Sequence, residues 1–356
     1  MGASQHRPRY RTAVILNMNA RKVTPSVVSR LKKADAHLDV FESHTMEEAH
    51  ELGREILERK YDYILTGGGD GTIAQLINTL FELTGRIGES SLRRPDAFSP
   101  TPLPALGVLK LGTGNAMAAH VGSGRYDRDA ARVGRAAESG MDLPTIKLPL
   151  VQCEGAIAPF GGLGWDAAVL NDYIAVKKRY TGPIGGWLAR SVFGYLIAAF
   201  TRTAPAMLRT APAEVEVKTL DEAILLGEKG EHLETYPPGT ILHTGPFSMV
   251  AYATIPYYGY RFRMFPFADR LEDRFQLRVA TTGVGEAIAH VPSIWAGRYR
   301  SSTLRDYLCR DVEVRSASQV PFQMAGDAHG VRTAVHLRLA PHCLDLIDFK
   351  TQLATQ

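Results

Sequence analysis

The chain has 356 residues, of which 45% are hydrophobic and 22% are charged, so it is a folded protein long enough for two domains. Its net charge of +4 is too small to indicate a nucleic-acid partner, and we expect none. The three cysteines are far apart, which argues against a zinc site and a disulfide framework. The polar, basic N-terminus argues against a signal peptide. We therefore expect a cytoplasmic protein whose membrane contact, if any, is peripheral.

The first 143 residues alternate between apolar runs and helical patterns, which predicts a parallel sheet with flanking helices. The first strand ends at Asn17, and a helix is expected over residues 25–34. The T-x-x-E sequence that begins at Thr45 is a capping box, which predicts a helix to about residue 60. Further strands are expected at residues 38–41, 61–66 and 105–111.

The most informative stretch is residues 61–78, where a strand is followed by four glycines in five positions and a helical pattern from Thr72. This arrangement leaves main-chain N–H groups accessible at a helix N-terminus, which favours phosphate binding by residues 67–72. Asp70 would repel phosphate unless a cation intervened, so it is a candidate Mg²⁺ ligand or proton acceptor. The alternative is a plain strand-to-helix turn with Asp70 as a helix cap.

A second glycine-rich segment, residues 112–115, directly follows the strand expected at 105–111. Ligands of parallel sheets bind beyond the carboxyl ends of the strands, so both glycine segments would line one crevice. Lys110 could contact phosphate there, although it is also an ordinary polar strand residue. The chain contains no P-loop motif, and the G-x-G-x-x-A match at residues 162–167 lies outside a βαβ unit, which argues against a Rossmann site.

After about Met141 the pattern changes to short strands, which predicts a β-rich, β-sandwich-like second domain over residues 144–356. The last ~15 residues could return to the first domain. Strands are expected at residues 145–152, 156–162, 213–218, 241–243, 248–254, 275–280, 312–315 and 334–339. Helical patterns occur at residues 284–300 and at 184–202, the latter apolar nearly all round. That apolar helix is expected either in the core between domains, or beside an apolar substrate cleft or membrane surface.

The residues from Thr66 to Thr72 resemble the GGDGT signature of the diacylglycerol kinase catalytic-domain superfamily, which includes bacterial lipid kinases and sphingosine kinases. Residues 111–118 are similar to the LGTGNDFA segment of its lipid-kinase branch. Weaker similarity continues at residues 162–169, 255–266 and 323–327, so the resemblance extends over nearly the whole chain.

The resemblance implies ATP binding in a cleft between the domains, with Mg²⁺, and transfer of the γ-phosphate to a hydroxyl of a lipid such as diacylglycerol or a sphingoid base. By position, it implies nucleotide contacts from Asn17, Thr66, Gly67, Gly68, Gly69, Asp70, Gly71, Thr72, Gly112, Thr113, Gly114 and Asn115. Asp166 matches a position near the acceptor head group, and Asp273 matches a ligand of a structural Mg²⁺. Asp327 is the candidate base, with Asp70 as the other carboxylate that could act.

The sequence departs from the family pattern at several of these positions. The loop after Asn17 lacks the proline and glycine of NPxxG, residues 272–277 depart from DDGxLD, and Asp327 stands where DGE carries the longer glutamate. Two alternatives therefore stay open: a weak or inactive lipid- or nucleotide-binding homologue, and a soluble-substrate kinase of the NAD kinase type. The acceptor lipid and the oligomeric state, including a homodimer, also stay open. Basic clusters at residues 7–11 and 177–179 are either solvated faces or contacts to anionic head groups.

Overall fold

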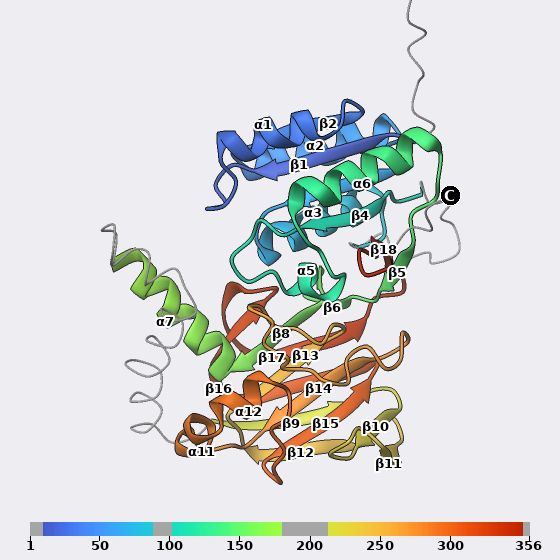
Figure 1. Ribbon diagram of the computed structural model, residues 1–356. Coiled ribbons are helices and arrows are strands. Elements are labelled where there is room, and N and C mark those ends of the chain that lie inside the picture. Colours follow the sequence, from blue (N-terminus) through green and yellow to red (C-terminus); the bar gives the residue numbers. More distant parts are fainter. Residues whose placement is uncertain (1–9, 88–101, 180–212, 352–356) are drawn as a thin grey trace, which may run out of the picture. The chain divides into compact units, whose positions relative to one another are not determined.

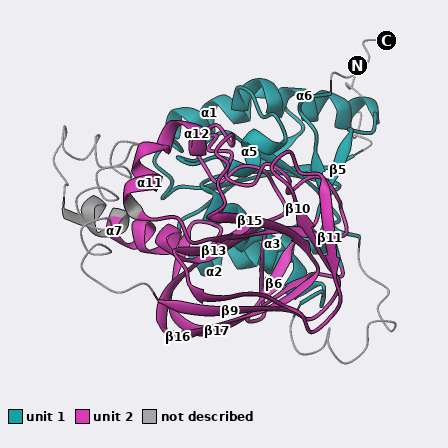
Figure 2. Ribbon diagram, turned by 90° about the horizontal axis from the view of Figure 1, so that it is seen from below, with its two compact units in different colours: residues 1–148, 342–356 teal, residues 149–341 magenta. Residues whose placement is uncertain are grey.

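The computed structural model describes residues 10–87, 102–179 and 213–351. The apolar helix expected at residues 184–202 lies outside these ranges, as do residues 7–9 of the N-terminal basic cluster. The chain divides into two compact units, residues 1–148 with 342–356, and residues 149–341 (Figure 2). The division expected from the sequence lay between residues 143 and 144.

The first unit is built on a six-stranded sheet with the order β2-β1-β3-β4-β18-β5 (Figure 1). Its strands are β1 (Thr12–Asn17), β2 (Leu38–Ser43), β3 (Tyr63–Gly67), β4 (Ala105–Leu109), β5 (Thr145–Leu148) and β18 (Leu344–Ile347). The first five strands of that order are parallel, and β5 runs antiparallel to β18. The predicted parallel sheet is confirmed, and the segments that follow β1, β3 and β4 lie at the same edge.

Five helices of the first unit lie within the described ranges. They are α1 (Pro25–Ala34), α2 (Met46–Glu58), α3 (Asp70–Leu83), α5 (Ala116–His120) and α6 (Tyr126–Ser139). The predicted cap of α2 is confirmed, because Thr45 Oγ1 accepts the backbone N–H of Glu48 at 3.1 Å. The α1 and α6 helices pack together, as do α2 and α3. The α6 helix was not predicted; it ends at Gly140, whose φ of 67° suits a glycine.

The second unit is a twelve-stranded antiparallel arrangement, which confirms the predicted β-rich domain. Its strands are β6 (Val151–Cys153), β7 (Ala156–Ala158), β8 (Phe160–Gly164), β9 (Glu214–Thr219), β10 (Ala223–Leu226), β11 (His232–Tyr236), β12 (Ile241–Pro246), β13 (Met249–Ala253), β14 (Phe275–Ala280), β15 (Leu304–Cys309), β16 (Asp311–Met324) and β17 (Asp327–Leu339). The long β16 pairs with β9 through residues 312–316 and with β8 through residues 322–324. It therefore joins the β9–β12 pair to the rest of the sheet.

Two elements of the second half differ from the predictions because of prolines. The strand expected at residues 145–152 is two strands, β5 and β6, which belong to different sheets. Pro149 lies between them and has no N–H for a strand ladder. The helix expected at residues 284–300 is likewise two short helices, α11 (Val284–Ala289) and α12 (Val291–Trp295). Pro292 lies in the first turn of α12, where a proline is tolerated, but it cannot continue a helix that arrives from α11.

The helix α7 (Trp165–Arg179) follows β8 directly and begins where Trp165 donates its N–H to Ser248 O at 2.9 Å. The core of this unit contains large aromatic side chains, with Phe160, Tyr252, Phe275 and Phe322 almost completely buried. Among the described residues, no helix combines the length and the apolar character needed to span a bilayer.

Candidate functional site

The first glycine segment is shorter, and α3 begins earlier, than the sequence predicted. Gly67 still belongs to β3, Gly69 is the N-cap of α3, and the helix starts at Asp70 rather than at Thr72. The first amides of a helix need no acceptor within it, and an acidic residue there interacts favourably with the helix dipole. Asp70 and Gly71 therefore form a regular first turn, and only Gly68 and Gly69 link the strand to the helix.

The consecutive glycines of this segment meet different surroundings. A Cβ atom at Gly67 would lie 2.6 Å from Leu16 Cδ2, and one at Gly68 would lie 2.8 Å from Thr72 Cβ. Within the part of the chain that the structure describes, a Cβ atom at Gly69 would meet no atom within 4 Å. The first two glycines thus make room for protein, whereas Gly69 faces open space.

The N-terminus of α3 offers several main-chain donors beside this open space. Ile73 donates the first helical hydrogen bond, to Gly69 O at 3.1 Å. The amides of Asp70, Gly71 and Thr72 precede it and have no acceptor within the helix. Together with the positive end of the helix dipole, they form a surface suited to an anion.

Asp70 connects the two glycine segments. Its Oδ2 and Oδ1 atoms accept the backbone N–H groups of Ala116 at 3.1 Å and Met117 at 3.2 Å, which are the first two residues of α5. Burial raises the pKa of Asp70, and these amide hydrogen bonds oppose the shift. Asp70 therefore caps α5, a role that the sequence did not reveal, because its partners lie 46 and 47 residues away.

The second segment packs directly against the first. A Cβ atom at Gly112 would lie 2.4 Å from Gly68 O, so only a glycine fits at this position. Asn115 has a left-handed backbone with a φ of 55°, and its Nδ2 atom donates to Gly112 O at 2.7 Å. Thr113 and Gly114 are half-buried between these two residues. The structure thus brings the two predicted segments together at one edge of the sheet.

Asn17 and Thr72 lie beside the same edge. Asn17 Nδ2 donates to Thr72 Oγ1 at 2.9 Å, so the Thr72 hydroxyl keeps its own proton for another acceptor. Thr66, which was also predicted to contact the nucleotide, is buried within β3.

Burial lowers the pKa of Lys22, and the positive charges of Lys110 and Arg21 lower it further. Three cationic side chains therefore gather among the segments that follow β1 and β4.

In the second unit, Asp166 is the centre of a buried polar cluster. Its side chain lies in the first turn of α7, and only 7% of the residue is exposed. Asp166 Oδ2 accepts hydrogen bonds from Tyr258 Oη at 2.6 Å and from Gln323 Nε2 at 3.0 Å, and Tyr258 and Gln323 also contact each other. Burial raises the pKa of Asp166, although both hydrogen bonds lower it. Its Oδ1 atom is buried and has no hydrogen-bond partner among the described residues.

This cluster draws together the three later segments that carry the weaker family resemblance, each of which supplies one of its residues. Tyr258 and Gln323 were not predicted as site residues. Nothing in the sequence around these two residues indicated a functional role, since a tyrosine beside a glycine and a glutamine in a strand are both common.

Asp327 opens β17, immediately after the turn that joins it to β16. Ala325 and Gly326 form this turn with positive φ angles of 50° and 83°, as in a tight two-residue hairpin. Gln323 Oε1 accepts the Gly326 N–H at 3.0 Å, which ties the turn to the Asp166 cluster. Asp327 itself is exposed; partial desolvation by the surrounding protein raises its pKa, and His329 opposes this shift.

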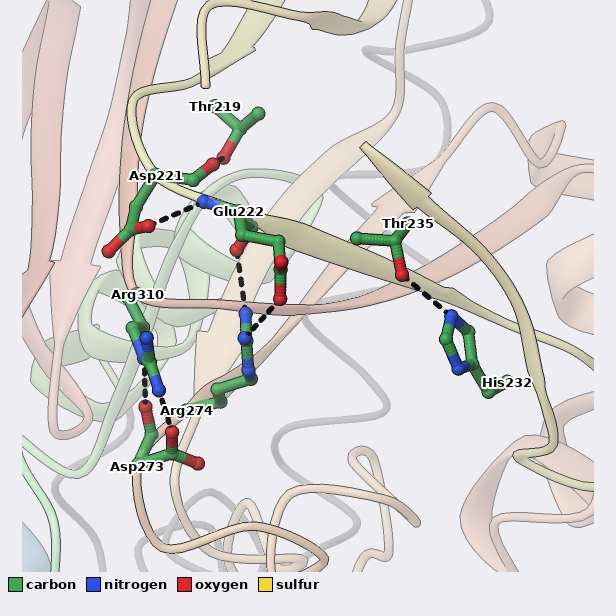
Figure 3. Close-up of polar contacts among 8 residues, drawn as sticks. All are labelled: Thr219, Asp221, Glu222, His232, Thr235, Asp273, Arg274 and Arg310. Atoms are coloured by element: carbon green, nitrogen blue, oxygen red, sulfur yellow. Dashed lines mark hydrogen bonds and ion pairs between the residues drawn. The ribbon is translucent and has the colours of Figure 1, made fainter. Parts of the chain in front are cut away.

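The surroundings of Asp273 do not fit the predicted structural Mg²⁺ site. Its carboxylate forms an ion pair with Arg310, whose Nε atom also donates to Asp273 O at 3.1 Å (Figure 3). The hydrogen bond from Arg310 lowers the pKa of Asp273. The neighbouring Arg274 pairs with Glu222 at 2.6 Å. In the part of the chain that the structure describes, no group of three or more His, Cys, Asp or Glu side chains could hold a metal ion.

Comparison with known proteins gives one family match and several structural ones. The diacylglycerol kinase catalytic domain matches residues 11–143, which include both glycine segments. No curated protein sequence matches the chain. A diacylglycerol kinase from Bacillus anthracis strain Sterne has a similar structure, with a TM-score of 0.57, 13% identity, and coverage of 95% of this chain and 97% of that one.

Two further structures are similar over nearly the whole chain. A candidate diacylglycerol kinase from the same organism has a TM-score of 0.60 and 15% identity, over 95% of this chain and 97% of that one. An NAD kinase from Archaeoglobus fulgidus, solved with ATP, has a TM-score of 0.45 and 12% identity, over 95% and 94% of the two chains. The two Bacillus proteins share the two-domain fold of this chain.

Proposed function

Because residues 11–143 belong to the diacylglycerol kinase catalytic-domain family, we propose that this protein is an ATP-dependent lipid kinase. It would transfer the γ-phosphate of ATP to a hydroxyl of a lipid such as diacylglycerol or a sphingoid base. The observation that carries the proposal is the open backbone at Gly69, inside the matched residues and beside the first amides of α3, which have no acceptor within the helix.

In this proposal, the first unit holds the nucleotide through its phosphates. The amides of Asp70, Gly71 and Thr72 donate to phosphate oxygens, and the Thr72 hydroxyl adds a further donor because Asn17 already occupies its lone pair. Lys22 and its cationic neighbours supply positive charge near the same edge of the sheet. Phosphoryl transfer depends mainly on such positioning and charge neutralisation.

Mg²⁺ would arrive with the nucleotide, where it neutralises phosphate charge. The described residues do not form a ready set of protein ligands for it, because both Asp70 oxygens already accept amide hydrogen bonds. We therefore assign Asp70 to holding the second glycine segment in place beside the phosphates, and no step is built on a protein-bound metal.

The second unit would recognise the acceptor lipid. The buried Oδ1 atom of Asp166 needs a donor, and a hydroxyl or ammonium of the lipid head group would supply one. An unsatisfied buried polar atom costs about 1–3 kcal/mol, so this contact would favour binding. The lipid oxygen would attack the γ-phosphorus, its proton would pass to the Asp327 carboxylate, and ADP would leave. Peripheral contact with a membrane would deliver the lipid.

A second candidate function is a binding protein that has lost most of its catalysis. Two observations favour it: Asp70 is committed to capping α5, and Asp327 is one methylene shorter than the glutamate of the family pattern. A misplacement of roughly 1 Å can cost about 10²-fold in rate.

The test is to incubate the purified protein with Mg·ATP and a panel of lipids, with NAD as a soluble acceptor. Lipid-dependent transfer that falls by about 10²- to 10⁴-fold in Asp327→Asn would support the kinase and its base. Asp269→Asn, another exposed aspartate of the same unit, is the matched control and should keep full activity. ATP binding without transfer to any acceptor would support the binding protein, and transfer to NAD would contradict the lipid kinase.

A further inference from the structure

The second unit contains a pocket whose lining residues are separate from the Asp166 cluster. It lies among β12, β14 and β15 and has a volume of about 420 Å³. This volume is within the roughly 300–1,000 Å³ typical of small-molecule sites. Three of its lining residues are apolar, and of these Ile241 is 52% exposed whereas Leu242 and Val279 are buried.

The polar residues of this β12–β15 pocket are cationic or neutral. Arg305 and His243 line it together with hydroxyl side chains such as Thr281 and Ser302, and none of the nine lining residues is acidic. An arginine presents up to five N–H donors in a planar fork that matches the oxygens of phosphate or carboxylate groups. The lining therefore offers donors beside one exposed apolar side chain, that of Ile241.

Arg305 belongs to the pocket lining and lies two residues before Tyr307 in β15. Burial raises the pKa of Tyr307, and a hydrogen bond from Arg305 opposes that shift. Tyr307 Oη donates in turn to Leu242 O at 3.0 Å, within β12. Arg305 itself is exposed, so its guanidinium is accessible to a ligand.

Glu286 does not line the pocket, but its carboxylate accepts a hydrogen bond from the lining residue Thr303 at 3.5 Å. Its carboxylate accepts hydrogen bonds from Ser301 at 2.9 Å and from Tyr299. These bonds lower the pKa of Glu286. Glu286 thus bonds to the loop that precedes β15, and Arg305 is the charged residue of the lining, because His243 Nε2 already donates to Pro246 O at 3.3 Å.

From this lining we propose that the β12–β15 pocket binds a phosphate monoester whose body is small and partly apolar. The phosphate group contacts Arg305 and the hydroxyls of Thr281 and Ser302, and the body packs on Ile241. The ligand can be a soluble phosphate ester or the head group of a phospholipid, because both present the same group. This site is independent of the proposed kinase reaction, since it shares no residue with either set of proposed substrate contacts.

The experiment records backbone amide NMR spectra of the isotope-labelled full chain during titration with glycerol 3-phosphate. A second arm uses phosphatidylcholine vesicles with and without phosphatidic acid. A saturating non-hydrolysable ATP analogue is present throughout, so that phosphate sites in the first unit stay occupied. The amides of residues 241–244, 281 and 302–305 should shift, and Arg305→Gln should weaken binding by about tenfold or more, the effect of losing a charge-assisted hydrogen bond.

Matched variants make the outcome specific. Arg338→Gln removes an exposed arginine from β17, outside the pocket, and should leave the titration unchanged. Ser302→Asp places a negative charge in the pocket and should abolish binding without any loss of packing, because Ser302 is exposed. Shifts with the soluble ester identify a small-molecule site, and shifts only with phosphatidic acid identify a head-group site. Absent shifts in both arms, or shifts that survive Arg305→Gln and Ser302→Asp, overturn the proposal.

Discussion

The substitution Gly69→Ala tests the nucleotide site without disturbing the fold. The added methyl would meet no protein atom within 4 Å, and the backbone angles of Gly69, φ −84° and ψ 171°, are open to alanine. Alanine is a poorer helix N-cap than glycine, but it also reduces the freedom of the unfolded chain by about 0.4–1 kcal/mol. These effects oppose each other, so the free energy of unfolding should change by less than about 1 kcal/mol.

Nucleotide affinity should fall by much more than stability. The methyl occupies the space that we assign to the phosphates, and it would push them away from the amides of α3. Loss of one hydrogen bond to a charged group costs about 1.5–3 kcal/mol, which corresponds to a roughly 10- to 150-fold weaker Kd. Calorimetric titration with a non-hydrolysable ATP analogue measures this change, and thermal unfolding checks the fold.

Gly283→Ala is the matched control. Gly283 is also a helix N-cap with extended backbone, φ −69° and ψ 156°, and its added Cβ atom would meet nothing within 4 Å. It lies in the second unit, at the start of α11, so its substitution should alter neither stability nor nucleotide binding appreciably. If Gly69→Ala bound the analogue as tightly as the wild type and Gly283→Ala, the phosphates would not lie at the N-terminus of α3.

Three further predictions concern the carboxylates. Asp70→Asn leaves a backbone N–H of α5 facing the NH₂ group of the new side chain, so the free energy of unfolding should fall by about 1–3 kcal/mol. A urea titration measures this change, and an unchanged midpoint would contradict the capping role of Asp70. Because burial raises the pKa of Asp166, its ionisation disfavours folding, and the free energy of unfolding of the wild type should fall as the pH rises from the ordinary aspartate pKa through the raised one. Asp166→Asn should remove this pH dependence. If the urea midpoints of the wild type and the variant followed parallel pH profiles, this prediction would be refuted. Since Arg310 pairs with Asp273, EDTA should not shift the melting temperature. Arg310→Gln should lower the free energy of unfolding by only about 0.2–1 kcal/mol, as is typical of exposed ion pairs. A melting temperature that drops in EDTA would instead support a metal site at Asp273.

The sequence predicted those parts of the fold that depend on local patterns. The parallel strands of the first unit are continuous apolar runs, and the cap at Thr45 needs only its own neighbours, so both were readable. Pro149 was also a readable signal, since a proline within an expected strand argues for a break there. The β10–β11 hairpin was missed because every residue of β11 is at least partly exposed, which leaves no apolar alternation to detect.

The contacts that define the candidate site were less predictable, because they join distant segments. Asp166 was marked only through the family resemblance, and its partners Tyr258 and Gln323 lie 92 and 157 residues further along the chain. No periodicity encodes such pairs; they follow from the order in which strands meet in a sheet. The same holds for Arg310, whose ion pair with Asp273 replaces the predicted metal contact.

The glycines of the first unit illustrate how one residue type can meet two physical demands. Gly67, Gly68 and Gly112 are needed because neighbouring protein atoms lie within 2.8 Å of the position that a Cβ atom would take. Gly69 is different, since no atom of the described residues lies within 4 Å of the position that its Cβ atom would take. Packing therefore explains three of these glycines, whereas Gly69 is favoured as the N-cap of α3. Its open backbone lies beside three amides that have no helical acceptor, which is why we assign the phosphate site to this end of α3.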